Sequence, residues 1–277
     1  MPVARLGRKT LLVAIVLLVA AAVVFATVNR ANAGSQPVLR VYLCSAAQKP
    51  WKEIIQAFTK ETGVRVEAVY GSSGSLLAQL RLAGGDVYAP AAPYYMEKAV
   101  KDGLVDASTV REAVLLYPVI LVPRGNPAGI HSLRDLARPG VRVGLGEPSR
   151  VAVGRYAKQL LQQCGLWEKV RKNIVVYAKN VADLTNYVAM GAVDAAITWD
   201  VNHWWYPGKT EAIPIPEKCW ESLGPSYIPI AVASSSKHPD LAKRFIEYVT
   251  RSPTARRIWL RYHYHPVLGD QRGMEQP

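Results

Sequence analysis

Short apolar runs and amphipathic helical stretches follow each other along the chain from residue 37 onward. The run Val38–Leu43 has strand length, and after Pro50 the apolar residues Trp51, Ile54, Ile55 and Phe58 recur at helical spacing. The same alternation predicts further strands at 64–70, 86–89, 115–122, 141–145, 174–177, 195–199 and 227–233, and helices at 76–82, 94–101, 151–164, 181–190, 239–250 and 253–261. Strands separated by helices at this spacing predict parallel βαβ units and therefore open α/β sheets.

The folded part of the chain is predicted to form two such α/β segments. The 277 residues suffice for two cores, since a domain commonly has about 150 residues. Pro118 interrupts the apolar run 115–122 and Pro123 stops it, so we expect this strand to leave the first segment. Residues 207–225 are rich in proline and glycine and are predicted as loop. No period of twenty to fifty residues repeats, which disfavours solenoids and propellers.

Residues 1–33 have the order of an export signal. Three basic residues precede the apolar run Leu11–Val28, and Ala31-Asn32-Ala33 follows as an Ala-x-Ala cleavage pattern. The run of about 18 residues also reaches the minimum that spans a bilayer, so a retained N-terminal anchor stays open as the alternative. Either way, we expect the rest of the chain to work outside the cytoplasm, in the periplasm or its equivalent.

The strongly positive net charge is weaker evidence for a nucleic-acid partner once the positions of the basic residues are considered. The formal net charge is +13, and residues 1–33 hold four basic and no acidic residues, so 13 minus 4 leaves +9 for the remainder. The remaining basic residues are scattered along predicted helices and form no single block, as at Lys52, Lys60, Lys98 and Lys101. A solvated basic face is therefore favoured, and no nucleic-acid partner is expected.

Three cysteines, Cys44, Cys164 and Cys219, form no Cys-x-x-Cys pair, which argues against a zinc site. In an oxidising compartment Cys164 and Cys219 can form a disulfide, provided that they lie close together. Cys44 fits a small buried residue at a strand end.

Four predicted helix starts follow strands and carry no acidic cap. They are Ser45-Ala46-Ala47, Gly71-Ser72-Ser73-Gly74-Ser75, Pro148–Gly154 and Asn180-Val181. Helix N-termini present unpaired N–H groups and the positive end of the helix dipole, and in open sheets they gather at the carboxyl edge of the strands. Facing lobes would aim all four at one cleft, which suits a small anion.

Several motifs give the chain a resemblance to a known family. They are Leu39-Arg40-Val41-Tyr42, Gly71–Leu76, Gly144–Pro148 with Gly154–Ala157, Asp194–Ile197, and Ser236–Pro239 leading to Phe245-Ile246. From about Val38 to Tyr262 the chain resembles the periplasmic binding proteins of molybdate and tungstate ABC importers. This resemblance implies the two-lobed type II fold, with two open α/β sheets joined by a two-stranded hinge. Lobe I would comprise 37–117 plus 230–277, and lobe II 118–229.

The resemblance also implies a set of ligand contacts. The loop serine of the family corresponds to Ser73, with Ser72 beside it, and the helix-start amides correspond to Val153 and Val181. The first-strand serine falls on Ala46, with Ser45 one residue earlier, so either one is the expected contact. Trp199 occupies the position of a tyrosine, so a hydroxyl donor is missing there, and the neighbouring Asp200 would repel a dianion unless it points away.

The function implied is capture of molybdate or tungstate as ligand, by hinged closure, for the membrane subunits of an ABC importer. No cofactor, no cation site and no catalysis are expected; metal enters only within the oxyanion. A monomer is expected, with membrane contact only through an N-terminal anchor.

Rival functions have weaker support in the sequence. Gly71–Ser75 departs from the Gly-x-Ser-x-Gly elbow of hydrolases, and Ser234-x-x-Lys237 lacks its companion motifs. His263 and His265 could share one strand face and bind a metal, but no carboxylate or cysteine lies near in sequence. The aromatic run His203–Tyr206 could stack on an organic ligand, which leaves a binding protein or tethered sensor for another anion or small organic solute as the alternative.

Overall fold

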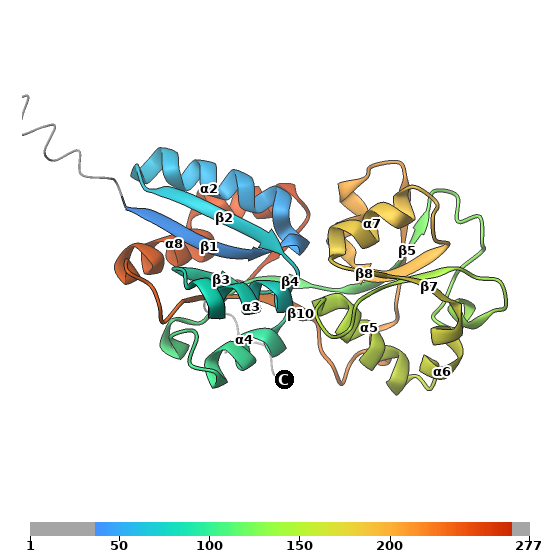
Figure 1. Cartoon of the computed structure of the whole chain (residues 1–277). Coiled ribbons are helices and arrows are strands. Elements are labelled where there is room, and N and C mark those ends of the chain that lie inside the picture. Colours follow the sequence, from blue (N-terminus) through green and yellow to red (C-terminus); the bar gives the residue numbers. More distant parts are fainter. Residues whose placement is uncertain (1–36, 268–277) are drawn as a thin grey trace, which may run out of the picture. The chain divides into compact units, whose positions relative to one another are not determined.

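The computed structural model describes residues 37–267, which form two mixed sheets covered by helices (Figure 1). The two open α/β sheets predicted from the sequence are therefore confirmed. None of the helices among these residues is long and apolar enough to span a bilayer. The expected export signal or anchor at 1–33 lies outside the described residues.

The first sheet has six strands in the order β11-β4-β10-β3-β1-β2. The strands are β1 (Val38–Cys44), β2 (Arg65–Gly71), β3 (Val87–Ala89), β4 (Arg111–Leu116), β10 (Ser226–Val232) and β11 (His265–Pro266). Its helices are α2 (Gln48–Thr62), α3 (Ser73–Ala83), α4 (Pro93–Lys101), α8 (Pro239–Arg251) and α9 (Pro253–Arg261), with the short η1 (Ser45–Ala47) and η2 (Ala107–Thr109). β1 pairs in parallel with β2 and β3, whereas β10 runs antiparallel to β3 and β4. We call this sheet with its helices lobe I.

The second sheet, with its helices called lobe II, has five strands in the order β7-β6-β8-β5-β9. The strands are β5 (Pro118–Pro123), β6 (Val143–Gly146), β7 (Ile174–Ala178), β8 (Ala195–Trp199) and β9 (Thr210–Pro214). The helices are α5 (Ala152–Gln163), α6 (Trp167–Val170) and α7 (Val181–Ala189), with η3 (Asp135–Ala137), η4 (Arg171–Asn173), η5 (Asp200–Trp205) and η6 (Glu217–Cys219). β6 is parallel to β7 and β8, and β5 is antiparallel to β8 and β9.

Apolar periodicity explains how the helices attach. α2 buries Trp51, Ile54 and Phe58 at the predicted spacing and ends where Gly63 takes a left-handed conformation, with φ of 74°. The ring of Phe58 meets Phe245 of α8 at 5.1 Å, and Trp51 meets Trp259 of α9 at 4.8 Å, both edge to face. The two C-terminal helices therefore pack beside the N-terminal one in lobe I.

The apolar run 115–122, expected as one strand, is two strands that belong to different sheets. Tyr117 alone separates β4 from β5, and the proline at 118 lacks the N–H that would continue the first ladder. The chain returns to lobe I at β10, where Ser226 is already paired with Leu116. The boundary expected between residues 229 and 230 falls inside β10, where the register shifts between Ile228 and Pro229.

The segment 207–225, expected as loop, contains the additional strand β9. Thr210–Pro214 pairs antiparallel with Val119–Pro123 and forms the edge of the second sheet. The prolines and glycines around this short strand favoured a loop in the sequence analysis. Proline is nevertheless tolerated at strand ends and on edge strands, which is where β9 lies.

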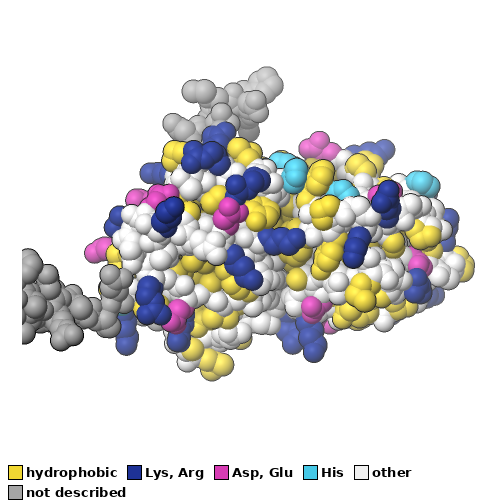
Figure 2. Space-filling model, turned by 90° about the horizontal axis from the view of Figure 1, so that it is seen from above, with side chains coloured by type: hydrophobic (Ala, Val, Ile, Leu, Met, Phe, Trp, Pro, Cys, Tyr) yellow, Lys and Arg dark blue, Asp and Glu magenta, His cyan; other side chains and the backbone are white. Residues whose placement is uncertain are grey.

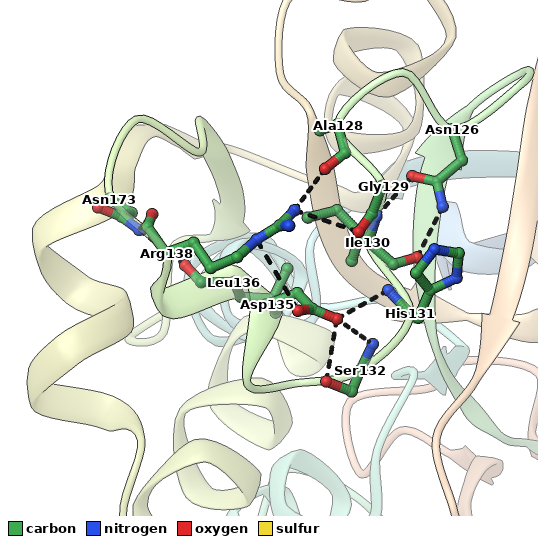
Figure 3. A network of polar contacts seen from close by, with 10 residues as sticks. All are labelled: Asn126, Ala128, Gly129, Ile130, His131, Ser132, Asp135, Leu136, Arg138 and Asn173. Atoms are coloured by element: carbon green, nitrogen blue, oxygen red, sulfur yellow. Dashed lines mark hydrogen bonds and ion pairs between the residues drawn. The ribbon is translucent and has the colours of Figure 1, made fainter.

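The long connection between β5 and β6 is held by side chain to backbone hydrogen bonds (Figure 3). The Asp135 carboxylate accepts from the backbone N–H groups of His131 at 2.9 Å and Ser132 at 2.8 Å, and these bonds lower its pKa. Asn173 donates to the carbonyl oxygens of Leu136 and Arg138. The connection is thereby ordered without adding to either sheet.

Candidate functional site

A small cavity lies where the segments after β1, β2, β3, β6 and β7 meet the end of β8. Its lining residues are Cys44, Ser45, Ala46, Gly71, Ser72, Ser73, Ala91, Val151, Ala152, Val153, Val181 and Trp199. All seven residues singled out from the sequence are among them, so the structure brings the expected helix starts to one place. No lining residue carries a charge. The space open to the centre of a water molecule is about 10 Å³, so the lobes must part before a solute can enter.

Lobe I contributes hydroxyl groups to this cavity. Ser73, the first residue of α3, is 2% exposed, and its Oγ accepts the backbone N–H of Ala91 at 3.0 Å. A hydroxyl has one hydrogen to donate, and since this Oγ acts as acceptor toward Ala91, that hydrogen stays available for a ligand. The Oγ of Ser72 donates to Ser75 at 2.8 Å. Ser45 and Ala46 both line the cavity from η1, so the structure leaves both as candidates.

Lobe II contributes two helix N-termini. α5 begins at Ala152 and α7 at Val181, and neither Val153 nor Val181 is more than 3% exposed. The α5 terminus can reach the cavity because Gly154 lies directly against the end of β6: a Cβ there would be 2.0 Å from the carbonyl oxygen of Gly146. The first turn of α5 contains no acidic residue that would compete with an anion for its N–H groups.

Trp199 carries a buried donor without a partner. Its side chain is fully buried, and its Nε1 is one of four buried side-chain nitrogens of the described residues that make no hydrogen bond. The others belong to Trp51, Asn202 and Trp205, none of which lines the cavity itself, although the Trp51 side chain interacts with the thiol of the lining residue Cys44. The Tyr156 ring packs edge to face on the Trp199 indole at 5.2 Å and restrains its orientation. Buried N–H groups are nearly always paired, and Trp199 is the one residue of these four that lines the cavity, so its N–H is a candidate donor to a ligand.

Asp200 does not line the cavity, although it follows Trp199 directly. Its Oδ1 accepts the backbone N–H of Tyr117 at 3.1 Å, and its Oδ2 lies 2.8 Å from Nε2 of His265. Both carboxylate oxygens are therefore engaged at the crossing between the sheets. In this orientation Asp200 does not face the cavity, so the repulsion of a dianion that the sequence suggested is avoided.

The two lobes contact each other beside the cavity. The N–H of Gly74 donates to the carbonyl oxygen of Arg150 at 2.9 Å, and the Tyr95 hydroxyl donates to the carbonyl oxygen of Ser149 at 3.2 Å. The Arg155 guanidinium lies over the Tyr94 ring, 3.6 Å from its centroid. These contacts join α3 and α4 to the segment that leads into α5, so the structure represents a closed arrangement.

A family model described as bacterial extracellular solute-binding protein matches residues 39–265. The chain belongs to this family. The putative ABC transporter substrate-binding lipoprotein YvgL of Bacillus subtilis is 30% identical over 234 residues, or 82% of this chain and 85% of the relative. The molybdate-binding protein ModA of Mycobacterium tuberculosis is 29% identical over 220 residues, or 79% of this chain and 80% of the relative.

Solved structures place this solute-binding protein in the two-lobed type II class. The sulfate-binding protein SubI from Mycobacterium tuberculosis matches with a TM-score of 0.71 and 18% identity, covering 83% of this chain and 87% of that one. At this identity the match shows the fold alone. The resemblance drawn from the sequence is thus confirmed, and so is the expectation of a binding protein for transport instead of an enzyme.

The histidine pair and the aromatic run that suggested rival functions do not line the cavity of this solute-binding protein. The His263 ring stacks on Trp204 at 3.9 Å, and His265 pairs with Asp200. Among residues 37–267 no three His, Cys, Asp or Glu side chains gather as metal ligands. None of the aromatic residues at 203–206 lines the cavity. On the face shown in Figure 2, Lys and Arg side chains are dispersed among acidic and apolar ones.

The pairing of His265 with Asp200 makes the stability of this solute-binding protein depend on pH. The hydrogen bond to Asp200 raises the pKa of His265, although partial burial opposes the shift. A raised pKa means that the stabilisation is complete below the unfolded value of about 6.5 and is lost as pH rises through the folded pKa. We therefore expect the melting temperature of the ligand-free protein to fall from about pH 6.5 upward.

Thermal melts of wild type and His265→Gln between pH 5.5 and 8.5 measure this dependence. The variant should show a flatter profile, with the difference from wild type largest at the acidic end. His238→Gln is the matched control, because His238 precedes α8 and lies outside the contacts of Asp200. Parallel profiles for wild type and His265→Gln would contradict the prediction.

Proposed function

We propose that this solute-binding protein captures a small tetrahedral oxyanion, molybdate or tungstate, in the cavity between its lobes. The observation that carries the proposal is a lining that offers donors and no fixed charge: the hydroxyls of Ser45 and Ser73, the N–H groups at the starts of α3, α5 and α7, and the indole N–H of Trp199. A relative with 29% identity over most of the chain carries the name of a molybdate-binding protein, which supports this choice of anion.

A lining of neutral donors suits a fully deprotonated dianion. The anion loses its hydration on entry, and convergent N–H and O–H groups replace it with charge-assisted hydrogen bonds. A singly protonated anion such as hydrogen phosphate needs an acceptor for its proton, and no carboxylate or histidine lines the cavity. The lining therefore favours molybdate, tungstate and sulfate over phosphate, and the cavity size decides among the first three.

Binding and delivery follow from closure about the crossings at Tyr117 and at the start of β10. Opening separates the α3 and α4 side of the cavity from the α5 and α7 side, and the anion bridges the two when they close. The closed surface is then read by the membrane subunits of an ABC importer. We propose that the protein acts as a monomer outside the cytoplasm, after export directed by residues 1–33 or while anchored by them.

Calorimetric titration of the exported protein with molybdate, tungstate, sulfate, phosphate and thiosulfate tests the proposal. Tight binding of molybdate and tungstate is expected, with phosphate weakest. If sulfate binds most tightly, the cavity is still an oxyanion site, but its substrate is sulfate and not molybdate or tungstate. Binding of none of the five anions would overturn the proposal and favour another small solute.

Trp199→Phe isolates the contribution of the indole N–H. Phenylalanine preserves an aromatic ring against Tyr156 but has no donor, so affinity for the anion is expected to fall by about 10- to 100-fold, the equivalent of about 1.5–3 kcal/mol for a hydrogen bond to a charged group. Trp167→Phe is the control, because it makes the same exchange at a tryptophan of α6 that does not line the cavity. Equal affinities of wild type and Trp199→Phe, measured by the same titration, would remove Trp199 from the donor set.

A further inference from the structure

Two of the three cysteines lie together at the end of α5. Cys164 is the residue that follows the last turn of this helix, and Cys219 is the last residue of η6. The Cys164 thiol donates to the carbonyl oxygen of Cys219 with Sγ and O 4.0 Å apart. Burial raises the pKa of Cys164, and its interaction with the Cys219 thiol raises it further. Both side chains are partly exposed, so a solution oxidant can reach them.

The compartment supplies the second reason to pair them. The family is extracellular, and thiols that meet in exported proteins are commonly oxidised. We propose that Cys164 and Cys219 form a disulfide in the exported protein, and that Cys44 stays reduced. Cys44 is 1% exposed at the end of β1, and burial raises its pKa to about 12, which makes it inert as a thiolate.

The reaction is thiol–disulfide exchange with an extracytoplasmic protein disulfide. One cysteine thiolate attacks the oxidant's disulfide and forms a mixed disulfide, and the second thiolate then displaces the oxidant. One S–S bond forms between the two cysteines. Their two protons and two electrons convert the oxidant's disulfide into two thiols.

The bond would join the loop before β10 to the helix that forms part of the cavity. Two hydrogen bonds already connect them: Tyr156 donates to the carbonyl oxygen of Gly224 at 2.8 Å, and Ser222 donates to Gln163 at 3.2 Å. The same loop carries Trp220, whose ring lies 6.1 Å from the ring of Tyr117 at the crossing between the sheets. A covalent link would make this loop and α5 move as one piece during closure, with rotation confined to the crossings.

Counting thiols in the full chain, purified from the oxidising compartment of a bacterial host, tests the proposal. The protein is alkylated in denaturant, digested and examined by mass spectrometry with and without prior reduction. One alkylated cysteine per chain, Cys44, and a linked pair of peptides containing Cys164 and Cys219 are expected. Three alkylated cysteines, or a bond that includes Cys44, would overturn the proposal.

Thermal stability provides a second readout that does not depend on ligand. Cys164→Ser, Cys219→Ser and the double variant should each melt about 5 to 15 °C below oxidised wild type, because the loop closed by the bond spans many residues. The three losses should be equal, since each removes the same bond. Reductant should lower only the wild-type midpoint. Additive losses, or a wild-type midpoint that reductant leaves unchanged, would contradict the disulfide, whatever the anion titration shows.

Discussion

Gly154→Ala is expected to lower the free energy of unfolding by more than about 3 kcal/mol and to abolish anion binding. The added Cβ would lie 2.0 Å from the carbonyl oxygen of Gly146 and 2.4 Å from its carbonyl carbon. Both are backbone atoms, so no side-chain rotation relieves the overlap. α5 would have to move away from the end of β6, which takes the Val153 amide out of the cavity.

Urea unfolding of the ligand-free variant measures this loss, and calorimetry measures binding. Gly71→Ala is the matched control for stability alone, because Gly71 itself lines the cavity: its Cβ would meet only the side chain of Leu76, at 3.2 Å, which can shift. The control should lose less than about 1.5 kcal/mol. A stability of Gly154→Ala within about 0.5 kcal/mol of wild type would show that the helix start and the strand end tolerate separation.

Gly74→Ala is expected to weaken anion binding at least tenfold, or about 1.4 kcal/mol, without destabilising the ligand-free protein. The Cβ would lie 3.0 Å from Cα and 3.1 Å from the carbonyl oxygen of Arg150, across the boundary between the lobes. Opening of the lobes would remove both contacts and leave only the side-chain atom Cε1 of Tyr95, at 3.3 Å within lobe I. Gly74 is only the second residue of α3, so we expect alanine to favour the helix by less than the roughly 1 kcal/mol of an interior position.

For Gly74→Ala, a lower anion affinity together with an unchanged or higher stability distinguishes a closure defect from a folding defect. Urea unfolding without ligand should give an unchanged or higher stability for Gly74→Ala, while calorimetry with the tightest of the five anions gives a weaker affinity. Unchanged affinity would indicate that this contact between the lobes is absent from the bound form. A loss of stability like that of Gly154→Ala would place the overlap in the open form as well.

The sequence predicted the order of elements and the gathering of the helix starts because both depend on local patterns. Apolar spacing defined α2, α5 and β8 to within a few residues. Ser73, Val153 and Val181 meet because parallel strands deliver the following helix starts to a common edge. Neither inference needs knowledge of distant contacts.

Features that depend on long-range contacts were missed. β9 exists because the β5 edge is available for pairing, and the start of β10 is set by its pairing with Leu116. The orientation of Asp200 depends on a histidine 65 residues later in the chain. The unpaired nitrogen of Trp199 could be suspected from the residue type, but only burial shows that it has no other partner.

None of the twelve lining residues carries a charge, so the association rate and the dissociation rate of the anion should respond differently to salt. Ions in solution screen the scattered basic surface residues, and this screening acts on how fast an anion approaches the open protein. Once the lobes close, the anion is held by dipoles at contact distance, which screening hardly reaches. Raising the ionic strength should therefore slow association and leave dissociation nearly unchanged, so that salt determines the rate of capture more than the lifetime of the complex.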